Sequence, residues 1–226
     1  MKKITVSFFC LILISFFSSC SKKENPIGEN NTSTGKNTLD GYFPNSLGSS
    51  WTMKVTNSDT TGGTFTISII SGDTTVNNIK YLKFKASYLL LLDVISYYRV
   101  DSNAMYGLNT EETNDSIPNP PYETKEFDIF LPVGSKWSYK DYDKYSKTSN
   151  IEYTIISKDT SIIVNNINYS NCICTKNIEK TTDDLDFEKI VTSYHFYSKG
   201  IGLIYLYQID NYGYEMKQEL INYTIK

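Results

Sequence analysis

The feature that most constrains the fold of this chain is an internal repeat. The segment from Phe43 to Trp51 recurs, one residue shorter, from Phe130 to Trp137. Each copy has a glycine three residues before its tryptophan, and the two tryptophans lie 86 residues apart. Self-similarity at a fixed offset means that one structural unit occurs twice, so we expect both copies to share one fold.

The repeat extends well beyond the tryptophans. Residues 69–74 (IISGDT) match residues 155–160 (IISKDT) at the same offset. After two extra residues in the second copy, residues 76–81 (VNNIKY) match residues 164–169 (VNNINY). These matches divide the chain that follows the N-terminal region into two homologous units, residues 41–125 and residues 126–226.

Both units have the pattern of consecutive β-strands. Alternation of apolar and polar residues dominates, as in residues 64–69 (TFTISI), and no segment beyond the N-terminal leader has a helical stripe of useful length. The paired asparagines tolerate positive φ and therefore favour tight hairpins. The 19 tyrosines and 11 phenylalanines suit half-buried strands. The pattern predicts five strands in each unit.

We therefore predict an all-β, antiparallel protein in which the two tandem units pack together. A unit of this size buries little surface by itself, which favours packing of one unit against the other. The sequence leaves two arrangements open. One is a sandwich of two small sheets, and the other is a single curved sheet resembling half of a barrel.

The N-terminus has the parts of a bacterial export signal. A basic Met-Lys-Lys start precedes an apolar run over residues 4–17, which is shorter than the ~20 residues of a spanning helix. Residues 17–20 (FSSC) resemble a lipobox, the cleavage and acylation motif of bacterial lipoproteins. The resemblance implies that residues 1–19 are a signal peptide. It also implies that Cys20 carries the acyl chains that hold the protein on a membrane.

The segment that follows, residues 20–40, is predicted to be the acylated cysteine and a flexible tether. Only Ile27 and Leu39 are bulky and apolar there, so the segment cannot bury enough surface to order itself. Its charges balance, which assigns anchoring to the lipid rather than to a basic patch. The whole chain has a formal net charge of −3 and no basic stripe, so nucleic acid is not an expected partner.

Two of the four cysteines remain in the repeat units, Cys172 and Cys174. Two cysteines do not make a disulfide framework, and a zinc site would need further ligands that no second Cys or His cluster supplies. At an offset of 88 residues they align with Phe84 and Ala86, both apolar. We interpret both thiols as small apolar groups of the core.

His195 is the only histidine and lies in a strand-like run without a nucleophile motif beside it, so we interpret it as an ordinary strand residue rather than a catalytic base. Residues 183–186 (DDLD) lack the glycine and final glutamate of a calcium loop and are interpreted as a hairpin turn. No catalytic residue, metal or cofactor is expected.

The tryptophan motifs have two readings. A tryptophan after a glycine turn at equivalent points of both units favours a role in the core of each unit. The alternative is an exposed aromatic platform for a glycan. The positions that this repeat assigns to structure are Trp51, Trp137, Gly48, Gly134, Pro44 and Pro132.

Three of these features together resemble uncharacterised envelope lipoproteins of the Bacteroidetes type. They are the Pro-x-Gly-x-x-Trp motif at residues 132–137, the Tyr-x-x-Gly-x-Gly-Leu motif at residues 197–203 and the short lipidated leader. The resemblance covers most of residues 41–226. That family has no established activity, so it implies an address and a fold but no functional residues.

The sequence predicts a non-enzymatic, membrane-tethered protein that binds or scaffolds an envelope protein, a glycan or a lipid. Anchoring to the outer membrane is the expected location, and the oligomeric state stays open. One alternative is a carrier of a hydrophobic ligand in a groove beside residues 88–95 (YLLLLDVI), which are apolar on both strand faces. The last alternative is a hydrolase that uses His195.

Overall fold

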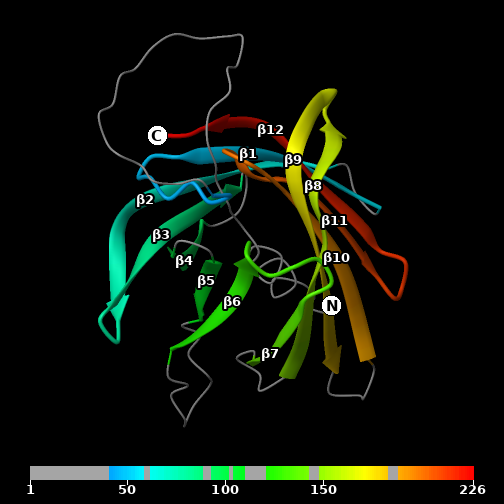
Figure 1. Ribbon diagram of the computed structural model, residues 1–226, viewed down its shortest axis with the longest axis horizontal. Coiled ribbons are helices and arrows are strands. Elements are labelled where there is room, and N and C mark those ends of the chain that lie inside the picture. The colour runs from blue at the N-terminus through cyan, green and yellow to red at the C-terminus, as the bar shows by residue number, and fades with distance from the viewer. Residues whose placement is uncertain are drawn as a thin grey trace, which may run out of the picture.

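The computed structural model describes residues 41–58, 62–88, 93–101, 104–109, 121–142, 148–182 and 188–226. All regular structure in these residues is β (Figure 1). The first unit holds β1 (Ser50–Asn57), β2 (Thr64–Val76), β3 (Ile79–Tyr88), β4 (Val94–Val100), β5 (Ala104–Asn109) and β6 (Tyr122–Asp128), the last of which runs past the predicted boundary after residue 125. The second holds β7 (Lys136–Tyr142), β8 (Thr148–Val164), β9 (Ile167–Thr182), β10 (Glu188–Ser198), β11 (Gly202–Asp210) and β12 (Glu215–Thr224).

The strands form a single antiparallel sheet in the order β6-β5-β4-β3-β2-β1-β12-β11-β10-β9-β8-β7. This confirms the all-β, antiparallel prediction and selects the continuous curved sheet over the sandwich. The sheet curls into a nearly closed, barrel-shaped wall (Figure 1). Within each unit the strands follow chain order, and the units join where β1 pairs with β12. Each unit has six strands, one more than the sequence pattern predicted.

The turn before the first strand of each unit is built the same way twice. The backbone N–H of Gly48 donates to the carbonyl of Ile69 at 3.0 Å, and that of Gly134 donates to Ile155 at 2.8 Å. Both glycines have φ close to +87°, a left-handed conformation that side chains with a Cβ rarely adopt. The repeated glycine is therefore a backbone requirement of the turn.

The Asn-Asn pairs make the predicted two-residue hairpin loops. Asn77 and Asn78 have φ of 51° and 64°, and Asn165 and Asn166 have φ of 49° and 64°. Positive φ at both central residues matches the twist of antiparallel strands, and asparagine tolerates it better than most residues. These loops join β2 to β3 and β8 to β9.

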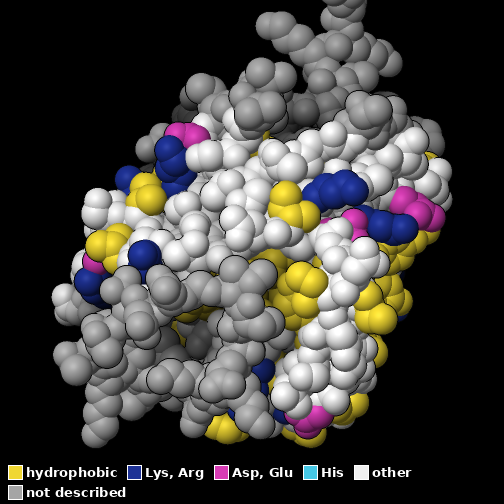
Figure 2. Space-filling model, turned by 90° about the horizontal axis from the view of Figure 1, so that it is seen from above, with side chains coloured by type: hydrophobic (Ala, Val, Ile, Leu, Met, Phe, Trp, Pro, Cys, Tyr) yellow, Lys and Arg dark blue, Asp and Glu magenta, His cyan; other side chains and the backbone are white. Residues whose placement is uncertain are grey.

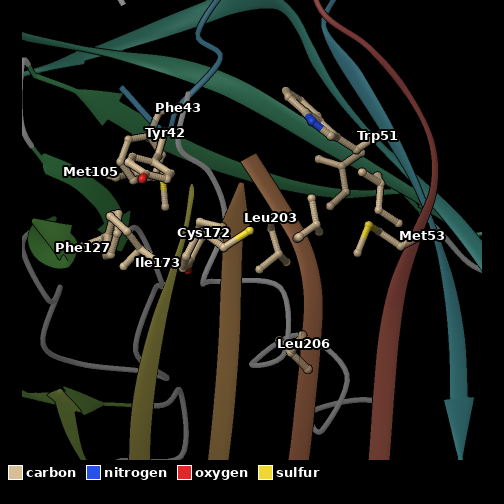
Figure 3. Close-up of a cluster of buried hydrophobic side chains, with 14 of the residues drawn as sticks. Tyr42, Phe43, Trp51, Met53, Met105, Phe127, Cys172, Ile173, Leu203 and Leu206 are labelled. Atoms are coloured by element: carbon tan, nitrogen blue, oxygen red, sulfur yellow. The ribbon is translucent and has the colours of Figure 1, made fainter. Parts of the chain in front are cut away.

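One end of the barrel-shaped wall is filled by side chains. We call it the plugged end, and it is the end at which β1, β3, β5, β7, β9 and β11 begin. Phe43, from the segment before β1, packs edge-on against Phe127 at 5.4 Å, and Phe127 stacks on Tyr197 at 4.8 Å. Figure 3 shows this cluster continuing to Trp51 and Met53.

The distal part of the β8–β9 hairpin also covers the plugged end. Asp159 and Asn171 have φ of 55° and 53°, and the register of the hairpin shifts at three places near them. Bulges of this kind bend a strand. The bent hairpin is held by the Asn165 amide, which donates to the carbonyl of Leu220 at 2.8 Å, and by the Tyr42 hydroxyl, which donates to the carbonyl of Asn171 at 2.8 Å.

The two edge strands, β6 and β7, meet through side chains. The indole N–H of Trp137 donates to the backbone carbonyl of Lys125 at 2.8 Å. The Tyr153 hydroxyl donates to the Glu126 carboxylate at 2.8 Å, and the Lys158 ammonium donates to the carbonyl of Ile129 at 2.5 Å. We call this junction the seam. It closes the wall with isolated hydrogen bonds instead of a ladder.

Candidate functional site

Five polar side chains on the inner face of β9–β12 form the candidate site. They are Asn177, Ser193, His195, Gln208 and Gln218, and we call them the inner polar wall. Along β10, β11 and β12 buried residues alternate with more exposed ones, as a strand between an interior and solvent requires. The polar residues occupy buried positions of that alternation, where apolar residues are the usual choice.

The strand register brings these residues together. Ser193 pairs with Asn177 on one side and with Gln208 on the other, so the three form one cross-strand row. In the adjacent row Leu206 pairs with His195 and with Gln218. Directly paired residues have Cβ atoms ~5 Å apart, so the five side chains form one continuous surface.

Three amide oxygens in this wall are buried and accept no hydrogen bond within the described structure: Asn177 Oδ1, Gln208 Oε1 and Gln218 Oε1. The Gln208 and Gln218 side chains belong to residues that are 9% and 3% exposed. A buried acceptor without a donor destabilises a fold by ~1–3 kcal/mol. The three groups lie on β9, β11 and β12, within the same wall.

His195 is 1% exposed and lies against the Tyr197 ring, with ring centroids 6.2 Å apart. Burial lowers the pKa of the imidazole to about 3, because the charged form would lose its hydration. His195 is therefore neutral at every physiological pH. The inner polar wall presents neutral hydrogen-bonding groups and no charge.

A buried carboxylate, Glu126 on β6, lies across the seam from β8. The Thr124 hydroxyl donates to it at 2.9 Å and the Tyr153 hydroxyl at 2.8 Å. Burial raises the pKa of Tyr98, Tyr153 and Tyr197 far above the ordinary value, and the nearby Glu126 charge raises each pKa further. These tyrosines stay protonated and available as donors.

The inner face of β1, β2 and β3 is apolar. β1, β2 and β3 contribute buried Met53, Phe65, Ile67, Phe84 and Ala86. The inner polar wall on β9–β12 and the apolar surface of β1–β3 thus belong to different parts of the same sheet. A molecule that entered this interior would meet both chemistries.

The repeated tryptophans differ in their surroundings. Trp51 is fully buried, and its indole N–H donates to the carbonyl of Ile201 at 2.6 Å, so Trp51 is a core residue and not a surface platform. Trp137 is half-buried at the seam and stacks on Tyr153 at 5.3 Å. Pro44 is buried beside Phe43, whereas Pro132 is exposed.

Both thiols of the second unit are buried and free. Burial raises the pKa of Cys172 to about 11 and that of Cys174 to about 12. The positions aligned with them in the first unit, Phe84 and Ala86, are buried as well. Cys172 belongs to the core cluster of the plugged end (Figure 3).

Several predicted features lie outside the described residues. These are the signal peptide (1–19), Cys20 and the tether (20–40), the leucine run at 89–92 and the acidic run at 183–186. Within the described ranges, no group of three His, Cys, Asp or Glu residues is arranged to hold a metal ion. The described part of the chain also contains no helix long and apolar enough to cross a membrane.

Of the five residues of the wall, the sequence singled out only His195, and Asn177, Ser193, Gln208 and Gln218 were missed. For the two glutamines a signal was present. The available signal is their place in alternating strands, Leu206-x-Gln208-x-Asp210 and Met216-x-Gln218-x-Leu220. A polar residue at the apolar phase of an alternating strand is a mismatch. Its meaning depends on which face is enclosed, and that is set by the closure of the whole sheet.

Comparison with known proteins gives neighbours of the fold. A structure described as "a putative lipoprotein" from Parabacteroides distasonis matches with a TM-score of 0.53 and 14% identity, over 80% of this chain and 97% of that one. A second, described as "a putative exported protein with YmcC-like fold" from Bacteroides fragilis, matches with a TM-score of 0.50 and 11% identity, over 80% of this chain and 98% of that one. No family model and no curated protein matches the sequence. Identities this low show a shared fold.

Proposed function

We propose that the protein is a non-enzymatic binding protein, anchored by lipid on Cys20 to the outer membrane, that receives a small neutral ligand at the inner polar wall. The observation that carries the proposal is the set of three buried amide oxygens without donors, on Asn177, Gln208 and Gln218. A ligand with O–H or N–H groups supplies the donors that the fold lacks.

The chemistry of the wall favours one class of ligand. Every group in it is neutral, because His195 carries no charge. Amide and hydroxyl side chains bind hydroxyls well, since they both accept and donate. The apolar residues of β1–β3 suit the carbon skeleton of a sugar or a similar molecule. We therefore favour a neutral, hydroxyl-rich ligand over a purely hydrophobic one.

A non-enzymatic role fits the state of His195. A general base works best when its pKa is near the operating pH, and a pKa of about 3 makes this imidazole a weak base. Support for the envelope comes from the leader sequence and from fold neighbours described as a lipoprotein and an exported protein.

The test is a thermal-shift and calorimetric titration of the full chain carrying Cys20→Ser, with a panel of neutral mono- and oligosaccharides as probes. We expect at least one saccharide to raise Tm, and Gln208→Leu and Gln218→Leu to abolish that rise. Asn222→Leu, at an exposed position of β12, is the matched control and retains it. Absence of any rise in Tm across the panel, or a rise in both wall variants as large as in the unsubstituted protein, refutes the proposal.

A further inference from the structure

The exposed apolar side chains of this protein are concentrated at the plugged end. Within the described ranges, six large apolar side chains are more than half exposed. Five of them, Leu47, Phe130, Val133, Ile163 and Ile167, lie in or beside the connections at that end. The sixth, Tyr212, lies in the β11–β12 turn at the opposite end. Single exposed apolar residues are ordinary, but a group on one end of a molecule marks an interaction surface.

These five side chains lie at three separate connections between strands. Leu47 precedes β1, Phe130 and Val133 lie between β6 and β7, and Ile163 and Ile167 flank the β8–β9 loop. Tight turns usually carry polar residues, so an apolar residue at each of three tips is unexpected. Their exposed fractions run from 54% to 71%, so they protrude and do not line a groove.

The repeat accounts for part of this arrangement. Leu47 and Val133 precede Gly48 and Gly134, which make the equivalent turns of the two units. β1 lies in the middle of the sheet and β7 at its edge, so in a closed wall the two turns are well separated on the same end. Figure 2 views the molecule from above Figure 1, the side toward which the β8–β9 hairpin points, and shows apolar side chains in groups.

The chain that leads back to Cys20 starts from the same end. Tyr42 is buried there, one residue after the first described residue, Gly41. A random coil of ~20 residues, the length of chain between Cys20 and Gly41, spans about 25 Å on average. A ten-residue strand such as β12 is itself ~33 Å long. A span of that length keeps the plugged end closer to the lipid anchor than the opposite end is.

We infer that the plugged end is a membrane-docking face, and that its apolar tips insert into the surface of the bilayer that holds the lipid anchor. The inference rests on the proposed anchoring through Cys20 but not on the inner polar wall. Burial of apolar side chains in the interfacial region is favourable in the same way as burial in a core. Docking orients the barrel with the β11–β12 turn pointing away from the membrane.

The first experiment places tryptophans at the two ends of the lipidated full chain, Leu47→Trp at the plugged end and Tyr212→Trp at the other as its control. Each protein is reconstituted into vesicles of phosphatidylethanolamine and phosphatidylglycerol containing brominated lipid, and fluorescence quenching is compared with the unsubstituted chain. We expect added quenching only for Leu47→Trp. Equal quenching in the two variants, or none in either, overturns the docking face.

The second experiment separates docking from anchoring. The mature chain, residues 20–226, carrying Cys20→Ser is floated with the same vesicles, alone and with Leu47→Ser, Val133→Ser and Ile163→Ser combined. We expect the triple variant to lower vesicle binding at least tenfold, and Tyr212→Ser to leave it unchanged. Equal binding of all forms overturns the inference. Mass spectrometry of Cys20 from cells reports lipid anchoring independently. If the protein is lipidated but its tryptophan at residue 47 is not quenched, the docking inference is refuted while the proposed anchoring stands.

Discussion

Replacement of His195 by glutamine is predicted to remove an acid sensitivity of the fold. In the folded protein burial holds the pKa of His195 near 3, whereas the unfolded chain has the ordinary value of 6.5. The unfolded state therefore binds a proton below pH 6.5 that the folded state rejects. The contribution of the neutral His195 to the free energy of unfolding is therefore fully present above pH 6.5 and is lost as the pH falls from 6.5 toward 3.

The magnitude follows from the two pKa values. Between pH 8 and pH 5 the unfolded chain protonates this imidazole and the folded chain does not. The difference in bound protons, summed over this pH range, amounts to ~1.5 pH units, and each unit corresponds to 1.36 kcal/mol. His195 alone should thus lower the free energy of unfolding by ~2 kcal/mol at pH 5 relative to pH 8. Asp93 and Glu123, whose pKa values are lowered by hydrogen bonds from Lys85 and Arg99, add acid sensitivity common to every variant.

The assay is urea denaturation at pH 8 and pH 5, followed by tyrosine and tryptophan fluorescence. We expect the difference between the two pH values to shrink by ~2 kcal/mol in His195→Gln. Val191→Ala is the control, since Val191 is a buried, non-titrating residue on the inner face of the same strand. Val191→Ala should lower the free energy of unfolding by the same amount at pH 8 and at pH 5. An unchanged pH dependence in His195→Gln would show that His195 is not held neutral by burial.

Three further predictions concern single residues. Gln218→Leu should raise the free energy of unfolding by ~1–3 kcal/mol in the absence of ligand, measured by denaturation, because it removes a buried oxygen without a donor; a loss of stability would refute the interpretation. Gly134→Ala should lower the free energy of unfolding by ~1–2 kcal/mol. The added Cβ would meet no neighbouring atom within 4 Å, so the cost comes only from the left-handed backbone conformation. Gly63→Ala, with open space and no positive φ, should be near neutral, and equal effects would contradict the argument. Cys172 and Cys174 should react with iodoacetamide only on unfolding, since burial raises both pKa values; rapid labelling of the native protein would refute this.

Much of the fold was predictable because its signals are local. The alternation of residues 64–69, the two Asn-Asn pairs and the glycine turns each act through neighbouring residues, and the repeat confirms one copy by the other. β6 escaped prediction because its inner-face positions carry Thr124 and Glu126, so its alternation is polar. Glu126 is tolerated there because hydroxyl groups of Thr124 and Tyr153 satisfy it.

The choice between a sandwich and one sheet could not be read from the sequence. It depends on whether β1 pairs with β12, and no local pattern specifies a partner strand so far along the chain. The same closure decides that Gln208 and Gln218 face an enclosed interior instead of solvent. The candidate site therefore depends on closure of the complete sheet, although each of its glutamines lies in a strand whose residues alternate in burial.

The pairing of β1 with β12 also determines when the molecule can fold. Ser50 pairs with Thr224, so β1, the first strand in the sequence, cannot complete its pairing until β12 is present. Trp51 likewise waits for the carbonyl of Ile201. The sheet cannot close until β12 is available, because β12 joins its two halves. The fold is thus compatible with export as an unfolded thread, and loss of the final ten residues would leave two open half-sheets with exposed edges.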